Sequence, residues 1–111
     1  MKDLSIRLAE LAAQRESKDE GFAQRLESLN RLVEVAQNHS GQSHHCRRIL
    51  LAVYNSDEWP LDLTRLRCLD ADLQRAALGV IEWAVYTSRE LHEYLPEGDA
   101  IMKRFWAIER E

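Results

Sequence analysis

Residues 38–50, NHSGQSHHCRRIL, gather side chains that could bind a metal ion or act as a nucleophile. Three of the four histidines, His39, His44 and His45, lie in this stretch, and Cys46, one of the two cysteines, follows them. Zinc needs three or four ligands that converge tetrahedrally. Neighbouring positions on a helix diverge by about 100°, so His44 and His45 cannot both face one ion. We therefore expect no metal ion at this stretch.

The same stretch could instead bind an anion. Ser43 is a good N-cap for a helix over 43–55, and Gly41 could end the preceding helix in the left-handed conformation. Free N–H groups and the helix dipole at such a start favour an anion. The candidate rim for an anion or an acidic partner group consists of Gln42, Ser43, His44, His45, Arg47 and Arg48. An ordinary capped helix with a solvated basic face explains the same residues, and this alternative stays open.

Neither cysteine has the surroundings of a catalytic nucleophile. Cys46 shares a helical face with Ile49 and Val53, which places it toward a core, whereas a reactive thiolate needs an exposed and electropositive position. Cys68, in LRCLD, has no histidine near it in the sequence. No GxGxxG or P-loop pattern is present either. We therefore expect no enzyme, no catalytic residue and no cofactor.

The spacing of apolar residues predicts helices along the whole chain. The expected helices span 2–15, 22–36, 43–55, 62–70 and 71–89, followed by a C-terminal one with the apolar stripe Ile101, Phe105 and Ile108. Segment 71–89 is apolar nearly all round, which is typical of a buried helix, and Trp83 and Phe105 should be buried. The predicted fold class is all-α: a compact bundle of about five helices with a central apolar helix near 71–89.

The N-terminal segment leaves two possibilities open. At 111 residues the chain is expected to be a single helical domain over 1–111. Within it, 1–20 is an amphipathic helix that is either peripheral or part of an oligomer interface. Leu4, Leu8 and Leu11 could pack on the chain's own core or form a homodimer.

Composition limits the partners and the compartment. The chain is 45% hydrophobic and 31% charged, with a net charge of −4, which suits a globular protein and argues against general nucleic-acid binding. Only residues 38–68 lean positive, and 69–111 are acidic. No apolar run approaches the roughly 20 residues of a membrane span, and the N-terminus has acidic residues where a signal peptide has none. We expect a cytoplasmic protein that does not enter a membrane.

Two blocks of sequence carry a resemblance to a known family. GQSHHCRRILLAVYNS and, further on, DLTRLRCLD resemble an uncharacterised domain family carried on proteobacterial plasmids and integrative elements. The resemblance covers residues 26 to about 85. This chain departs from it at His44-His45, where relatives are rich in arginine, and at Cys46, where an apolar residue is usual. The resemblance implies a bacterial cytoplasm and a mobile genetic element, and it implies no activity.

These observations favour a small, non-enzymatic helical module that binds a protein partner and serves a bacterial mobile element. Trp59, in a loop before Pro60, is the candidate exposed interface aromatic. Two alternatives remain. The first is a nucleic-acid-associated regulator that uses the basic 44–67 segment. The second is an anti-CRISPR-like inhibitor of a host defence complex that uses the acidic C-terminal third.

Overall fold

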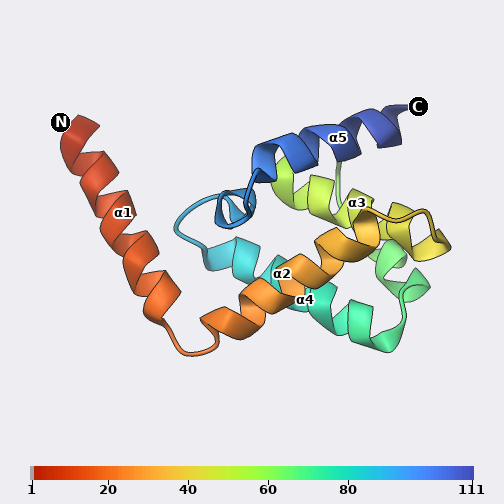
Figure 1. The fold of residues 1–111 in the computed structure, drawn as a ribbon, viewed down its shortest axis with the longest axis horizontal. Helices are drawn as coiled ribbons and strands as arrows, with labels where there is room; N and C mark the ends of the chain where they lie inside the picture. The colour runs from red at the N-terminus through yellow and green to blue at the C-terminus, as the bar shows by residue number, and fades with distance from the viewer. Residues whose placement is uncertain (1) are drawn as a thin grey trace.

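The computed structural model describes residues 2–111, with side chains from Leu4 onward; Met1, where the predicted domain begins, lies outside the described residues. Residues 2–111 form five α-helices and two short 3-10 helices, with no strand among them (Figure 1). They are α1 (Lys2–Lys18), α2 (Phe22–Ala36), α3 (Gly41–Tyr54), η1 (Leu63–Cys68), α4 (Ala71–Tyr86), η2 (Leu91–Tyr94) and α5 (Gly98–Arg110). The predicted all-α bundle of about five helices is confirmed.

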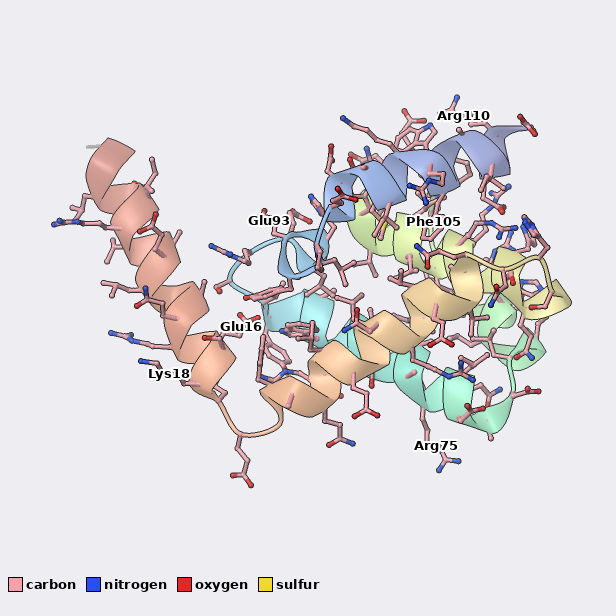
Figure 2. All side chains as sticks on the ribbon, viewed as in Figure 1. Glu16, Lys18, Arg75, Glu93, Phe105 and Arg110 are labelled. Atoms are coloured by element: carbon pink, nitrogen blue, oxygen red, sulfur yellow. The ribbon has the colours of Figure 1, made fainter. Side chains whose placement is uncertain are left out.

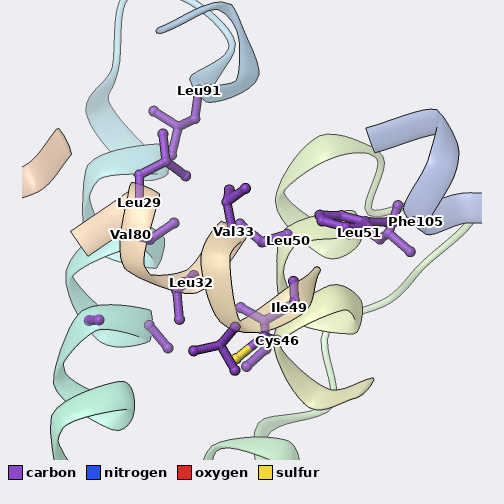
Figure 3. Packing of buried hydrophobic residues seen from close by; sticks show 14 of the residues in the cluster. Leu29, Leu32, Val33, Cys46, Ile49, Leu50, Leu51, Val80, Leu91 and Phe105 are labelled. Atoms are coloured by element: carbon purple, nitrogen blue, oxygen red, sulfur yellow. The ribbon is translucent and has the colours of Figure 1, made fainter. Parts of the chain in front are cut away.

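The elements from α2 to α5 form the body of the molecule. Helix α2 packs against both α3 and α4, and α5 lies along α3 (Figure 1). Their apolar stripes meet in one core, part of which Figure 3 shows, and its fully buried members include Leu29, Leu32, Ile49, Val80 and Phe105. Cys46, Trp83 and Phe105 are each 0% exposed, so their expected burial is confirmed.

Helix α4 departs from the expected helix in two ways. It ends at Tyr86 rather than near residue 89, and it is not buried all round, because Leu78 is 53% exposed and Val85 is 83% exposed. The buried side of α4 faces mainly α2. The body has no further layer of helices over the opposite side, so the apolar residues there remain in solvent.

Helix α1 stands away from the body (Figure 1). The chain turns between α1 and α2 at residues 19–21, where Gly21 has a φ of 88°, a left-handed conformation that glycine adopts without strain. Every side chain from Leu4 to Leu11 is exposed, and burial begins only at Ala13 and Glu16. Among residues 2–111, no helix is long and apolar enough to cross a membrane.

Candidate functional site

Helix α3 begins earlier than the sequence predicted. Ser40, not Ser43, is the N-cap, and Gly41 is the first helical residue rather than a left-handed end of α2. The two serines cap the helix reciprocally, since Ser43 N donates to Ser40 Oγ and Ser40 N donates to Ser43 Oγ. This reciprocal pattern is a capping box in which serine replaces the usual Glu or Gln at the third helical position. The predicted cap and helix start were therefore wrong by three and two positions.

The basic side chains of α3 converge on one carboxylate from the far end of the chain. Arg47 Nε and Arg48 Nε each lie 2.7 Å from an oxygen of Glu109, and His44 Nδ1 lies 2.6 Å from the same carboxylate. Arg47 also donates to the carbonyls of Ala36 and Asn38 at the C-terminal end of α2. This cluster therefore ties α5 and α2 to the start of α3.

The carboxylate at the centre of this cluster is well compensated. The side chain of Glu109 is only 3% exposed. Burial alone would raise the pKa of Glu109, but hydrogen bonds from Arg48 and Arg47 and the charge of the neighbouring cations hold that pKa below its usual value. Glu109 therefore stays ionised, and its single negative charge offsets one of the two positive charges of Arg47 and Arg48.

Arg65, from η1, is held differently. Its Nη1 lies 3.2 Å from His44 Nε2 and 3.2 Å from His45 Nδ1. Guanidinium nitrogens only donate, so both ring nitrogens must be unprotonated acceptors. His44 can meet this demand while its Nδ1–H donates to Glu109. Burial, together with the positive charge of Arg65, lowers the pKa of His45, which favours the neutral ring that the contact needs.

The predicted rim is only partly an outward surface. Ser43 is 0% exposed and Arg47 is 8% exposed, so these two residues do not face solvent as expected. Gln42 is engaged with Asp70, whose N–H donates to Gln42 Oε1 over 2.7 Å. The accessible remainder is the half-buried group His44, His45, Arg48 and Arg65. The predicted rim did not include Arg65, which η1 brings to it from outside residues 38–50, although the basic 44–67 segment contains this residue.

The histidines and the cysteine considered for metal binding and nucleophilic chemistry have different surroundings. The rings of His44 and His45 lie side by side, with centroids 5.3 Å apart, while His39 is exposed at the end of α2. Within residues 2–111, no group of three or more His, Cys, Asp or Glu could hold a metal ion. Burial raises the pKa of the Cys46 thiol to about 11, which keeps this thiol protonated at neutral pH.

Trp59 is not the exposed aromatic that its loop position suggested. It is 7% exposed, because its ring packs edge-on against Trp106 and lies under the guanidinium of Arg48, 4.6 Å from its centroid. The expectation of an exposed interface residue is therefore wrong. The loop folds back on α5 because cation–π and aromatic contacts stabilise the buried ring of Trp59.

A second polar site, which no sequence pattern predicted, surrounds Glu16 of α1. Its carboxylate lies between the end of α4 and η2 (Figure 2). The polar atoms within 3.0 Å of it are Trp83 Nε1 at 2.6 Å, Ser88 N at 2.8 Å, Thr87 Oγ1 and Tyr94 OH at 2.9 Å, and Ser88 Oγ at 3.0 Å. We call Trp83, Thr87, Ser88 and Tyr94 the cradle.

The cradle is built for a carboxylate rather than for a neutral group. Burial would raise the pKa of Glu16, but the hydrogen bonds from Ser88, Tyr94, Trp83 and Thr87 lower it from 4.5 to about 2. Phe22 supports the cradle by packing edge-on against the rings of Trp83 and Tyr94. Glu16 itself is only 6% exposed.

Beyond Glu16, α1 has little contact with the body. Leu4, Ile6, Leu8 and Leu11 are 59%, 56%, 58% and 49% exposed. An open groove of about 580 Å³ separates the N-terminal half of α1 from α3, α4 and η2, and its lining includes Ile6, Ala9, Val53, Ala84 and Leu91. Leu4, Leu8 and Leu11 lie along one side of α1, and a row of exposed leucines is a surface that monomeric proteins normally avoid.

Comparison with known proteins gives one match. A family model described as a family of unknown function (DUF7673) matches residues 26–110. Neither the curated proteins nor the solved structures contain a match to this chain. The resemblance to an uncharacterised domain family is therefore confirmed, while the plasmid or integrative-element setting stays a prediction. The matched region includes the cradle and the Glu109 cluster, whereas α1 and Glu16 lie before it.

Proposed function

Because this chain belongs to the DUF7673 family of unknown function, we propose a function from its own surface: it is a non-enzymatic protein-interaction module that docks through α1. The observation that carries the proposal is the exposed apolar face of Leu4, Leu8 and Leu11 on a helix that the body holds at one end only. Water destabilises such a face, and a protein surface with an apolar groove would cover it.

The geometry of α1 supports a docking role over a purely structural one. Isolated helices of this length are only marginally stable in water and gain most of their stability by packing an apolar face. The exposed leucines of α1 would therefore stabilise this helix only when a partner covers them. Leu4, Leu8 and Leu11 follow a four-three spacing, which aligns them along one side of a helix and suits insertion into a groove. The partner surface is therefore expected to be apolar.

A matched pair of variants tests this function. In the docking variant, Leu4, Leu8 and Leu11 are all changed to Ser; in the control, Leu78→Ser and Val85→Ser remove comparably exposed apolar side chains from α4. Each tagged protein is incubated with lysate of the organism that encodes it, and bound proteins are identified by mass spectrometry. We expect a bound protein that the control retains and the docking variant loses. Retention of the same proteins by the docking variant would refute the proposal.

The exposed part of the rim is a second candidate contact, for an acidic group of a protein partner. The observation that favours it is Arg65, whose guanidinium lies against the rings of His44 and His45 and, among the described side chains, has no carboxylate within ion-pair distance. A carboxylate or phosphate could therefore bind Arg65 without displacing an internal acid. Arg65→Ala should weaken capture of an acidic partner, whereas Arg67→Ala, on the exposed side of η1, should not. Equal effects of the two changes would contradict a specific site.

The earlier alternatives stand as weaker proposals. A nucleic-acid regulator would need phosphate contacts from 44–67, yet Arg47 and Arg48 are engaged with Glu109, which leaves Arg65 and Arg67 for such contacts. An inhibitor of a host defence complex would use the acidic residues after 69. Both, like the mobile-element setting, rest on the sequence and its resemblance.

A further inference from the structure

The cradle is a complete carboxylate-binding site whose occupant comes from outside the family region. Trp83, Thr87, Ser88 and Tyr94 all lie within the matched residues 26–110, whereas Glu16 lies before them. Two of the donors, Trp83 Nε1–H and Ser88 N–H, cannot act as acceptors, and they approach different oxygens of Glu16. A carboxylate therefore satisfies the donors of the cradle best. A carboxylate from a second copy of the chain would satisfy them equally well.

The connection between α1 and the body is poorly suited to keeping α1 in place. Only the C-terminal half of α1 touches the body, at Ala13 and Glu16, and the three-residue turn before α2 depends on the left-handed Gly21. Short hinges of this kind favour exchange of the adjoining element between copies.

The sequence of α1 is in register with that of α2. Each leucine of the α1 face lies 18 positions before a residue of α2 that packs in the core. The corresponding positions are Leu4 and Phe22, Leu8 and Leu26, and Leu11 and Leu29. Eighteen residues make about five turns of an α-helix. If residues 19–21 became helical, the leucine face would continue the apolar stripe of α2 and would extend beyond its own body.

We propose that two copies of this chain exchange α1, so that Glu16 of each copy occupies the cradle of the other. The inference rests on the proposed function and deepens it, because it names the partner of α1 as a second copy. The exchanged dimer keeps every hydrogen bond of the cradle. In the exchanged dimer the left-handed turn becomes helical, so that α1 and α2 form one continuous helix. The leucine face of each copy then packs against the continuous helix of the other, and this burial of apolar surface stabilises the dimer relative to the monomer.

Complementation between two defective chains tests the exchange. One chain carries Glu16→Ala and keeps the cradle; the other carries Thr87→Val with Tyr94→Phe and keeps Glu16. Within its own chain neither variant can form the full contact, but an exchanged heterodimer contains one intact cradle with its carboxylate. Native mass spectrometry of an equimolar mixture should show an excess of heterodimer, that is, more than the half of all dimers that random pairing of the two chains would give. Circular dichroism of each variant alone establishes that its helices are formed.

The hinge gives an independent measurement on the full chain. Gly21→Ala places a Cβ at a φ of 88° and 3.3 Å from Arg25 Nη1, which disfavours the turn and favours a straight helix. Light scattering after gel filtration should show dimerisation strengthened by roughly tenfold or more. Gly79→Ala is the control, because its Cβ would meet only Ser28 Oγ at 4.0 Å, and it should leave the equilibrium unchanged.

The outcomes separate this inference from the proposed function. A heterodimer in excess, together with a Gly21→Ala shift toward dimer, supports the exchange. A mixture without excess heterodimer refutes it, whether the wild type is a monomer or a dimer, and a Gly21→Ala shift toward monomer refutes it as well. If the leucine variant still loses a foreign protein while no heterodimer forms, α1 remains a docking helix and only the exchange fails.

Discussion

Two buried glutamates, near opposite ends of the chain, are satisfied by different chemistry. Glu109 meets three basic side chains, whereas the hydrogen bonds to Glu16 from the described residues come from neutral donors. Burying a carboxylate costs several kcal/mol unless hydrogen bonds or opposite charges compensate. Each glutamate helps to fasten its own terminal helix to the body. Helix α5 is also held by Phe105 in the core, whereas on α1 only Ala13 is buried beside Glu16.

Glu16→Gln should weaken the packing of α1 against its own body by roughly 2–3 kcal/mol. The amide group of glutamine has to face either Trp83 Nε1–H or Ser88 N–H, because these obligate donors lie at different oxygens. Urea unfolding followed by tryptophan fluorescence measures the change, since Trp83 reports on the cradle. Glu10→Gln, on the exposed part of α1, serves as the control and should be neutral. A neutral Glu16→Gln would mean that the cradle does not select a carboxylate.

Glu109→Gln should lower the free energy of unfolding by about 3 kcal/mol or more, because it leaves Arg47 buried without its counter-charge. The side chains of both residues are nearly inaccessible, at 9% and 3% exposed. Chemical denaturation at neutral pH measures the effect, and Glu111→Gln, which changes an exposed side chain, should change little. Equal stability of the two variants would show that the cluster contributes nothing net.

At the scale of elements, the junction between η2 and α5 depends on a close backbone approach. A Cβ on Gly98 would lie 1.8 Å from the carbonyl oxygen of His92, so no side chain fits without moving η2. The junction in turn sets the direction of α5, which carries Phe105 into the core and Glu109 to the rim.

Gly98→Ala should therefore destabilise the protein by roughly 1–3 kcal/mol, the usual cost of forced overpacking. Gly41→Ala is its matched control, because a Cβ there meets nothing within 4 Å and lies in the first turn of α3. Alanine is the better helix former, so the control should be neutral or slightly stabilising. Thermal unfolding of both variants checks the difference, and a neutral Gly98→Ala would contradict the close approach.

At the scale of the whole molecule, both buried glutamates make stability depend on acid pH. The pKa of Glu16 falls from 4.5 to about 2 on folding, and the pKa of Glu109 is also lowered. A group whose pKa is lower in the folded state stabilises the protein above its unfolded pKa and loses that contribution as the pH falls through the folded pKa. The molecule should therefore weaken below about pH 4.5.

Urea unfolding between pH 7 and pH 2 should show this loss, with Glu16 contributing roughly 3 kcal/mol of it. The Glu16→Gln variant cannot titrate at this position, so its stability should fall less steeply over the same range. Identical slopes for the wild type and the variant would show that the pKa of Glu16 is not lowered by the fold.

The sequence by itself determined the local structure. Spacing of apolar residues is a property of neighbours along the chain, and it correctly predicted the all-α class, the approximate helices and the burial of Cys46, Trp83 and Phe105. The resemblance likewise identified an uncharacterised family, which the comparison confirmed. Both kinds of inference succeed because they need no knowledge of which segments meet in space.

Only the tertiary structure decided what the polar residues do. Glu109 reaches Arg47 across 62 positions, and Glu16 reaches Tyr94 across 78, and no periodic pattern links positions so distant. The expected outward placement of Arg47 and the expected exposure of Trp59 were wrong for the same reason, since Glu109 and Trp106 of α5 contact them. Ser43 is buried instead of outward-facing, and it bonds to Ser40 in the capping box. A charge is free or neutralised according to partners that long-range packing brings to it, so the surface available for function emerges only in the folded molecule.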